Sequence, residues 1–206
     1  MRTEAPCRSP AAAFALFLLA AGPAVADAPL VIAHRGASGY LPEHTLEAKA
    51  PAHGMGADLL EQDVVLTRDG VPIVLHDLVL AELTDVADLY PGRAREDGRF
   101  YAIDFTLEEI RRLRQHERRL PGTGALRWPG RFDAEGVSFR IHTLEEELAF
   151  IAGLNQSSGR RAGIYPEIKE PAFHRAAGLD ITVRVLEVLR RAGYSRRADP
   201  VFLQCF

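Results

Sequence analysis

Two carboxylates, two residues apart in an apolar segment, are the first candidates for chemistry. Glu61 and Asp63 lie within residues 59–67, and in an extended strand both side chains point to the same face of a sheet. Neighbouring buried carboxylates repel each other and lose hydration unless a positive group joins them. Because both groups offer only oxygen, a hard divalent cation such as Ca²⁺, Mg²⁺ or Mn²⁺ suits the pair. A solvated pair on an edge strand is the alternative that this spacing leaves open.

A second charged pair has the same spacing at the end of residues 163–169. Glu167 would offer the cation a third oxygen ligand, and Lys169 would meet an anionic substrate. The alternative is a surface ion pair between the two side chains, which stabilises a protein by about 0–1 kcal/mol. This pair alone does not decide between the two interpretations.

Histidines stand at the ends of two other apolar segments. His34 ends the first segment and precedes Arg35, and His76 ends a later one. Two histidines at strand ends can act as general base and general acid, and the planar guanidinium of Arg35 can hold a phosphate. A structural role for each histidine is the alternative, but two of them beside carboxylate pairs favour a reactive site. No role is assigned to the remaining histidines, which are His44, His53, His116, His142 and His174.

Strand-like and helix-like segments alternate along the chain, which predicts a parallel sheet covered by helices. Strands are expected at residues 30–36, 163–169 and 201–206. Helices are expected at residues 45–56, from 106 onward, at 143–153 and at 181–192. Pro51 should kink or shorten the first helix. The polar residues come late in each strand, at the carboxyl edge where parallel sheets bind ligands.

Residues 59–77 allow two chain paths around an Asp-Gly dipeptide. One path is a β-hairpin, because two β-like runs flank that dipeptide. In the other path the chain crosses the sheet, returns in extended form over residues 64–70, and crosses the sheet again in the first direction. Both paths bring Asp63 close to His76, provided that the first strand ends near Asp63.

The segment of residues 78–140 is polar and rich in proline and glycine, apart from the helix that begins at Thr106. We therefore treat residues from about 78 to 142 as an insertion. His116 is expected on the surface of that helix, and five arginines are expected on its solvated face. They are Arg111, Arg112, Arg114, Arg118 and Arg119. A surface that binds anions or membrane headgroups is the alternative interpretation of these arginines.

Composition excludes several classes of protein. The 206 residues carry 25 basic and 28 acidic side chains, so no basic excess is available to neutralise a nucleic acid. With 2 cysteines, neither a disulfide scaffold nor a thiolate zinc cluster organises the fold. Gly-x-Ser-x-Gly, P-loop and Gly-x-Gly-x-x-Gly motifs do not occur in the sequence, which removes support for serine hydrolases, NTPases and dinucleotide enzymes.

Residues 1–26 are typical of a secretory signal peptide. Two arginines precede or flank an apolar run at 11–22, and Ala-Val-Ala at 24–26 is a small-x-small cleavage site. The apolar run is shorter than the ~20 residues that a membrane-spanning helix needs. We therefore expect one domain over residues 27–206, exported to the periplasm and without a stable membrane span after cleavage.

Five short motifs occur along the chain in a fixed order. They are His34-Arg35-Gly36-Ala37, Pro42-Glu43-His44-Thr45, Glu61-Gln62-Asp63, His76-Asp77 and Pro166-Glu167-Ile168-Lys169. Together they closely resemble the glycerophosphodiester phosphodiesterase family, above all its periplasmic, calcium-dependent type. The resemblance runs from about residue 30 to residue 206 and includes Tyr-Ala-Ile-Asp-Phe at 101–105. A single His-Arg-Gly is weak support for a family, whereas five ordered motifs are specific.

The resemblance implies an α/β fold, a TIM-like (β/α)₈ barrel that is here incomplete, with about five of its eight strands. The barrel favours the second path for residues 59–77, because it brings both apolar runs up through the sheet in parallel. The resemblance also implies the roles of single residues. Catalysis falls to His34 and His76, metal binding to Glu61, Asp63 and Glu167, and substrate binding to Arg35, Lys169 and Glu43. The cation would be Ca²⁺, with Mg²⁺ as the alternative.

The resemblance further implies hydrolysis of small-molecule glycerophosphodiesters to sn-glycerol 3-phosphate and an alcohol. The metal would bind a phosphate oxygen and the glycerol hydroxyl and lower the pKa of that hydroxyl. One histidine would take the proton and the other would protonate the leaving alcohol, through a cyclic glycerol phosphate that water later opens. The alternatives are an inactive or metal-binding remnant of that enzyme and a phospholipase-D-like lipid phosphodiesterase.

Three features depart from the family pattern. Glu82 stands where the family usually has arginine, and Pro51 lies inside the first expected helix. The segment 201–206 counts as only the fifth of about eight strands. We therefore expect residues 27–206 alone to be poorly soluble and essentially inactive, because open sheet edges and an open barrel interior would face water.

Overall fold

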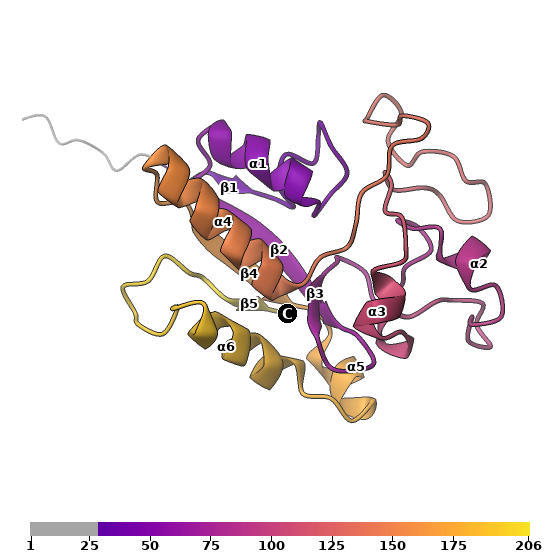
Figure 1. Cartoon of the computed structure of the whole chain (residues 1–206). Helices are drawn as coiled ribbons and strands as arrows, with labels where there is room; N and C mark the ends of the chain where they lie inside the picture. Colours follow the sequence, from indigo (N-terminus) through magenta and orange to yellow (C-terminus); the bar gives the residue numbers. More distant parts are fainter. Residues whose placement is uncertain (1–28) are drawn as a thin grey trace, which may run out of the picture.

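The structure, a computed structural model, describes residues 29–206, and the signal peptide expected at residues 1–26 lies outside this range. The described chain forms one 5-stranded sheet with helices packed against it (Figure 1). The strands are β1 (Ile32–Ala33), β2 (Leu59–Leu66), β3 (Pro72–Val74), β4 (Gly163–Ile168) and β5 (Gln204–Cys205). The helices are α1 (Leu46–Gly54), α2 (Val86–Leu89), the 3-10 helix η1 (Ala102–Asp104), α3 (Leu107–Ile110), α4 (Leu144–Ser158), α5 (Pro171–Ala176) and α6 (Ile181–Arg191).

The sheet is parallel apart from β3. Its order is β1-β2-β4-β5, and each neighbouring pair in this order is parallel. β2 is buried along its whole length, and its register with β4 places Asp63 opposite Glu167. The expected α/β class with a parallel sheet is therefore confirmed.

β3 runs in the opposite direction to the one that we expected, which was parallel to β2. It pairs antiparallel with the end of β2, with Val64 opposite Val74, so the hairpin path is observed and the up-back-up path is wrong. The physical reason is local: β2 continues beyond Asp63, and Gly70 at φ 75° allows the tight reversal. Asp63 and His76 are nevertheless close, as both paths predicted. The Leu75 N–H donates to the Asp63 carbonyl at 2.9 Å, which brings His76, the next residue, beside Asp63.

Side-chain alternation along β2 divides the helix-covered face of the sheet from the opposite face. Leu60 and Val64 pack in one apolar core with Ile151 of α4 and Val185 of α6. All three helices α1, α4 and α6 contribute to this core, and in Figure 1 α4 crosses in front of the strands with α1 above and α6 below them. The odd-numbered residues of β2, which include both carboxylates of the expected pair, therefore point to the opposite face.

Local capping signals set several helix ends. Thr106 and Thr143 each form the expected capping box, with Glu109 and Glu146 respectively. α1 is short, with 9 residues and a proline inside it, as expected. α4 extends past the expected end near residue 153. It ends at Gly159, which adopts the left-handed conformation (φ 70°) common at helix C-termini.

The prediction of a long basic helix after Thr106 is wrong. α3 ends at Ile110, and the chain then continues irregularly, held by antiparallel bridges from Gln115 to Thr84 and to Phe139. A second apolar cluster, which includes Phe105, Ile110 and Leu113, packs beside β3. Tertiary pairing of this segment therefore overrides its local helical pattern.

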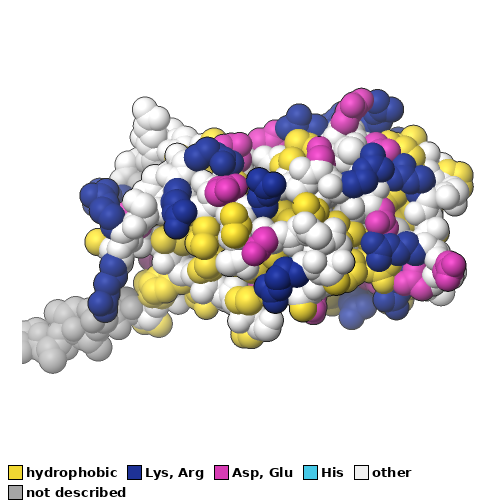
Figure 2. Space-filling view, turned by 90° about the horizontal axis from the view of Figure 1, so that it is seen from below, with side chains coloured by type: hydrophobic (Ala, Val, Ile, Leu, Met, Phe, Trp, Pro, Cys, Tyr) yellow, Lys and Arg dark blue, Asp and Glu magenta, His cyan; other side chains and the backbone are white. Residues whose placement is uncertain are grey.

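The edge strands are shorter than expected. β1 and β5 have 2 residues each, in place of the expected strands 30–36 and 201–206. Within residues 29–206, β1 pairs only with β2 and β5 only with β4. Large apolar side chains are exposed beside both edges, with Leu30 64%, Val31 55%, Phe202 53% and Phe206 92% exposed. In the view from below, apolar side chains run across the middle of the face among charged ones (Figure 2).

None of the helices among the described residues combines the length and the apolarity that crossing a membrane requires.

Candidate active site

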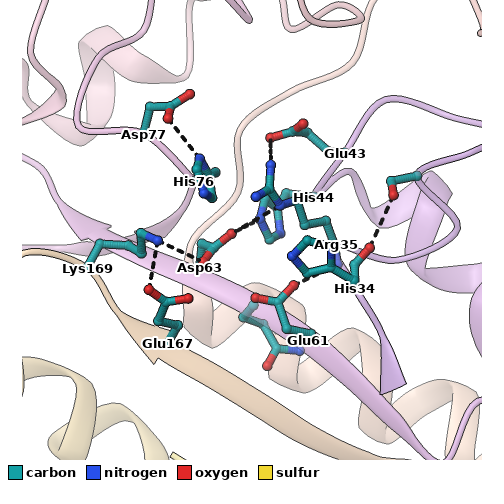
Figure 3. A network of polar contacts seen from close by, with 12 residues as sticks. His34, Arg35, Glu43, His44, Glu61, Asp63, His76, Asp77, Glu167 and Lys169 are labelled. Carbon is teal, nitrogen blue, oxygen red and sulfur yellow. Dashed lines mark hydrogen bonds and ion pairs between the residues drawn. The ribbon is translucent and has the colours of Figure 1, made fainter. Parts of the chain in front are cut away.

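Three carboxylates lie on the face of the sheet away from the core helices (Figure 3). Glu61 and Asp63 of β2 are 2% and 1% exposed, and Glu167 of β4 is in register with Asp63. The structure thus brings together the three residues that we expected to bind metal. A solvated pair on an edge strand is excluded, because β2 lies inside the sheet and is fully buried.

The two carboxylates of β2 differ in their titration. Burial and the neighbouring Asp63 charge raise the pKa of Glu61. Burial also disfavours the charged form of Asp63, but a hydrogen bond from His44 and the nearby positive groups outweigh it, so the pKa of Asp63 lies well below its usual range. Asp63 is therefore an ionised hydrogen-bond acceptor at neutral pH. Glu61 has the raised pKa of the two, so an added positive charge would favour its ionised form.

His44 belongs to this group, although we assigned it no role from the sequence. Its Nε2 lies 2.8 Å from Asp63 Oδ2, and both side chains are 1% exposed. Burial lowers the pKa of His44 to about 4, so the ring is neutral and its Nε2–H donates to the ionised carboxylate. His44 ends no strand, which is why the strand-end criterion missed it. The available signal was its place directly before Thr45, the residue that caps α1 and turns the chain into the site.

Two cations stand beside the carboxylates. Lys169 Nζ lies 2.7 Å from Glu167 Oε1 and 3.5 Å from Asp63 Oδ1. Arg35 donates its backbone N–H to Glu61 Oε2 at 2.6 Å, and its Nε lies 3.5 Å from Asp63 Oδ2. The pair of Lys169 and Glu167 is only 18% and 15% exposed, so it belongs to the site and is not the surface ion pair that we considered.

The two candidate acid–base histidines lie on opposite sides of the carboxylates (Figure 3). His76 Nδ1 is 2.8 Å from Asp77 Oδ1. Burial opposes ionisation of Asp77, but the hydrogen bond from His76 and the charge of Arg118 lower its pKa to about 2. The carboxylate therefore accepts the Nδ1–H, which leaves Nε2 of His76 for a substrate. His34 is exposed, and partial burial with the Arg35 charge lowers its pKa, which favours a neutral ring.

Glu43, which the resemblance placed among the substrate-binding residues, contacts Arg35. It is 2% exposed, and its Oε1 accepts a hydrogen bond from Arg35 Nη1 at 3.2 Å. Behind Glu43 lies Arg118, with 6% of its side chain exposed. Arg118 Nη1 also donates to Glu82 at 2.9 Å, so the glutamate that departs from the family pattern is paired. The prediction of a solvated arginine is wrong for Arg118, because the segment that carries it is packed against the site and is not a surface helix.

Backbone strain is concentrated around the site. Among the described non-glycine residues, positive φ occurs at Arg35 (60°), His44 (60°) and Glu170 (41°), the last directly after Lys169. Such conformations cost about 1–3 kcal/mol each and cluster at functional sites, where the surrounding structure enforces them. Glycine is required at Gly36, because its φ is +81° and an added Cβ would lie 3.0 Å from backbone atoms of Ala48.

A buried ion pair supports β2 from the helix side. Lys49 of α1 is 0% exposed, its Nζ lies 2.9 Å from Glu147 of α4, and it also donates to the Glu61 carbonyl. Glu147 further accepts a hydrogen bond from Gln62 at 2.8 Å and lies 2.6 Å from His142. In the sequence these charges resemble ordinary helix-surface residues, so pattern reasoning did not identify them. They fix the strand that carries both carboxylates.

A cavity of about 380 Å³ opens beside the candidate acid–base group. The residues that line it include His76, Lys169, Tyr101 and Phe173. The two aromatic rings are stacked, with centroids 5.5 Å apart. The cavity therefore has room for a small alcohol group next to a histidine.

The donor set suits a divalent cation. His44, Glu61 and Asp63 each place a ligand atom within 4.8 Å of the others, and all three are buried. Nδ1 of His44 is buried without a hydrogen-bond partner, so this cluster contains a polar atom whose hydrogen bonding is not satisfied by the protein. Ionised carboxylates are the ligands that hard cations prefer, and Glu167 supplies a further one across the strand pair.

The amino-acid sequence is similar to a family model and to several known proteins. Residues 34–206 match the family model described as the glycerophosphoryl diester phosphodiesterase family. A glycerophosphodiester phosphodiesterase of Haemophilus influenzae is 52% identical over 179 residues, which cover 86% of this chain and 49% of the relative. One of Treponema pallidum is 45% identical over 184 residues, with 86% and 50% covered. The chain thus spans about half the length of the curated relatives it matches.

Solved structures share the fold. A protein of Silicibacter pomeroyi described as a candidate glycerophosphoryl diester phosphodiesterase has a TM-score of 0.66 and 30% identity, covering 86% of this chain and 57% of that one. A phosphodiesterase of Oleispira antarctica, in complex with the product sn-glycerol-3-phosphate, has a TM-score of 0.57 and 24% identity, with 86% and 57% covered. The expected fold class, an incomplete TIM-like barrel of the phosphodiesterase type, is therefore confirmed.

Proposed function

This chain belongs to the glycerophosphoryl diester phosphodiesterase family, and we propose that it carries the reactive groups for hydrolysis of glycerophosphodiesters to sn-glycerol 3-phosphate and an alcohol. The observation that carries the proposal is the buried Glu61–Asp63 pair, with a histidine on each side of it. The names of both bacterial relatives, and the product bound to the Oleispira protein, support the same substrate class.

Arg35 and Lys169 would bind the phosphate. Both side chains contact carboxylates of the site, and an anionic phosphodiester offers them oxygens of the same kind. Glu43 accepts from Nη1 of Arg35, which fixes the plane of the guanidinium and leaves its other edge for a substrate oxygen. Lys169 lines the cavity beside His76, where the leaving alcohol fits.

His34 and His76 would transfer the protons. Asp77 accepts the Nδ1–H of His76, so the ring presents Nε2 to the substrate. His34 stands on the other side of the carboxylates as an exposed ring whose pKa is lowered, which suits a proton acceptor at neutral pH. One ring takes a proton from the attacking hydroxyl while the other gives one to the leaving alcohol.

Glu61, Asp63 and Glu167 would hold the cation, which we propose to be Ca²⁺, with Mg²⁺ as the alternative. When bound, the cation supplies Lewis-acid polarisation of the phosphate. His44 donates to Asp63 through Nε2, and that hydrogen bond orients the carboxylate as partners behind metal ligands commonly do. Lys169 is then free to turn from Glu167 towards the phosphate.

The test compares two forms of the protein. One is the full chain, and the other is the same chain joined after Phe206 to the second half of the Haemophilus relative, called here the extended chain. Release of sn-glycerol 3-phosphate from glycerophosphocholine is measured with a coupled dehydrogenase, with Ca²⁺, with Mg²⁺ and with chelator. The proposal expects metal-dependent release by the extended chain. Hydrolysis of sphingomyelin in its place would favour the phospholipase-D-like alternative, and metal binding without any hydrolysis would favour an inactive remnant.

We also propose export to the periplasm, on the signal-peptide features of residues 1–26. Expression of the full chain in a Gram-negative host and N-terminal sequencing of the periplasmic fraction should give a first residue of Asp27. Recovery of the uncleaved chain from the cytosol would contradict this proposal.

A further inference from the structure

Arg118 is a buried cation that contacts three carboxylates at once. Its Nη2 lies 2.8 Å from Glu43 Oε1, and its Nη1 lies 2.9 Å from Glu82 Oε2 and also pairs with Asp77. Only 6% of the Arg118 side chain is exposed. A buried arginine with this many acceptors is fixed in one orientation, because its planar fork satisfies several hydrogen bonds together.

Two of these carboxylates hold the residues proposed to act on the substrate. Glu43 accepts from Arg35 Nη1 at 3.2 Å, and Asp77 lies 2.8 Å from Nδ1 of His76. Arg118 itself contacts neither Arg35 nor His76. Arg118 therefore reaches both the phosphate-binding Arg35 and the acid–base His76 through one intervening carboxylate each. It joins the loop before α1, which carries Glu43, to the loop after β3, which carries Asp77.

Arg118 favours the ionised form of both carboxylates, for Asp77 together with the hydrogen bond from His76. Burial opposes ionisation of Glu43, but the hydrogen bond and the charge of Arg118 outweigh it and lower the pKa of Glu43. Ionised carboxylates only accept hydrogen bonds, so Arg35 and His76 must be the donors in their pairs. Without the guanidinium, the buried Glu43 and the partly exposed Asp77 and Glu82 would face one another with no shared cation, and the orientation of Glu43 and Asp77 would be lost.

On the basis of the function proposed above, we propose that Arg118 is a positioning residue that couples the phosphate-binding Arg35 to the proton-transferring His76, with Glu82 as the anchor of its guanidinium. Neither Arg118 nor Glu82 touches the substrate in this role. The segment of about residues 78–142 thereby contributes to catalysis, although it carries no group that reacts.

The proposal predicts a division of kinetic effects in the extended chain. Glu43→Gln weakens the hold on Arg35 directly and reaches His76 only through Arg118, so KM for glycerophosphocholine rises by a larger factor than kcat falls. Asp77→Asn weakens the hold on His76 directly and reaches Arg35 only through Arg118, so kcat falls by a larger factor than KM rises. Arg118→Met removes both, so KM rises and kcat falls, each by about tenfold, the scale of losing one buried hydrogen-bond partner. Arg118→Lys keeps the charge without the fork and lies between Arg118→Met and the unchanged protein.

The decisive test relocates the guanidinium. Glu82→Arg, placed in the Arg118→Met protein, supplies an arginine from the position that Arg118 contacts at 2.9 Å. We expect it to recover most of the lost kcat and to lower KM again. Arg114→Met is the matched control, because this arginine lies in the same segment with 74% of its side chain exposed and pairs with Asp85 at the surface. Its kinetics should equal those of the unchanged protein.

Two further readouts separate folding, this proposal and the proposed function. Circular dichroism melting identifies any variant that fails to fold, and Arg118→Lys then replaces Arg118→Met. Histidine side-chain NMR, assigned with His76→Gln, should show the Nδ1–H tautomer of His76 in the unchanged protein and its loss in Arg118→Met, whether or not the protein hydrolyses a diester. A folded Arg118→Met protein with unchanged tautomer, kcat and KM would overturn the positioning role. If the unchanged protein hydrolyses no diester, but His76 still loses its Nδ1–H tautomer in Arg118→Met, the proposed function is overturned and the positioning role of Arg118 is not.

Discussion

Asp63 of β2 lies directly opposite Glu167 of β4 in parallel register, and the ammonium of Lys169 lies 3.5 Å from the first carboxylate and 2.7 Å from the second. A single lysine thus compensates two acidic groups that come from strands far apart in the chain. Because a divalent cation would compete with this ammonium for the same oxygens, metal binding and the position of Lys169 are coupled. The first prediction follows from this relationship.

Asp63→Asn should abolish stabilisation by calcium. A ligand at a free concentration of 100 times its Kd stabilises a protein by about 2.7 kcal/mol, which corresponds to about 5–10 °C in Tm at this size. We expect that increase in the unchanged protein and none in the variant, measured by circular dichroism melting with and without Ca²⁺. Asp133→Asn is the control, because that carboxylate is 43% exposed in a surface ion pair. An equal calcium response in Asp63→Asn would remove this residue from the metal site.

Glu61→Gln should raise stability without metal and remove the response to metal. The pKa of Glu61 is raised above its unfolded value of 4.5, so the ionised form opposes folding at neutral pH. This cost declines as pH falls below the folded pKa and vanishes below the unfolded pKa. Glutamine keeps an acceptor for the Arg35 N–H but carries no charge. We expect a gain of about 1 kcal/mol or more at pH 7.5, the energy of one pKa unit, and a smaller gain near pH 4.5. Urea unfolding at both pH values with chelator measures it, and a loss of stability at pH 7.5 would refute the assignment.

Replacement of His34 or His76 by alanine should lower kcat of the extended chain by at least ~10²-fold, the usual scale for a lost proton-transfer group. His116→Ala should change kcat little. His116 lies outside the carboxylate group and its Nδ1 contacts the Glu117 carbonyl, although it is not on the surface helix that we expected. The coupled dehydrogenase assay measures all three variants. Equal losses in all three would show that the acid–base pair is misassigned.

His174 should make the protein less stable in mild acid. Burial lowers its pKa to about 4 from 6.5, and neither of its ring nitrogens has a hydrogen-bond partner. The unfolded chain therefore binds more protons between these pH values, and stability falls as pH decreases from 6.5 to 4. His174→Leu should reduce that fall by up to about 3 kcal/mol in urea unfolding. Part of the fall remains, because burial also lowers the pKa of His44 to about 4. A pH profile identical to that of the unchanged protein would contradict this account.

Local sequence patterns predicted what local physics decides. The capping boxes at Thr106 and Thr143 begin helices as expected, and the two-residue spacing of Glu61 and Asp63 places both on one face of β2. The same spacing correctly brought Glu167 and Lys169 into one group. Such predictions succeed because helix caps and strand alternation depend on neighbours within about four residues.

Contacts between distant segments were not predictable in the same way. The direction of β3 depends on how far β2 continues, and the family resemblance outweighed a hairpin signal that was correct. Arg118 was assigned to solvent because its segment looks helical, whereas pairing of Gln115 with two other segments holds that part of the chain against the site. His44 was missed for the same reason, since its partner Asp63 is distant in sequence.

The full chain without an extension should self-associate. Leu30 and Val31 beside β1 and Phe202 and Phe206 around β5 are 64%, 55%, 53% and 92% exposed, and within residues 29–206 both edge strands have one unpaired side. Unpaired strand edges with apolar side chains are templates for association, and a closed barrel of this type needs about eight strands. The sheet supplies four parallel strands, and the relatives are about twice as long. We therefore expect light scattering after size-exclusion chromatography to show oligomers or aggregates of residues 27–206 with negligible hydrolysis, and a soluble monomer with hydrolysis for the extended chain. Phe202→Lys with Phe206→Lys should reduce association of the shorter form without giving it activity, because the substitutions cover the edge but add no strands. A monomeric, cooperatively melting 27–206 protein with turnover near that of the extended chain would contradict the requirement for further strands.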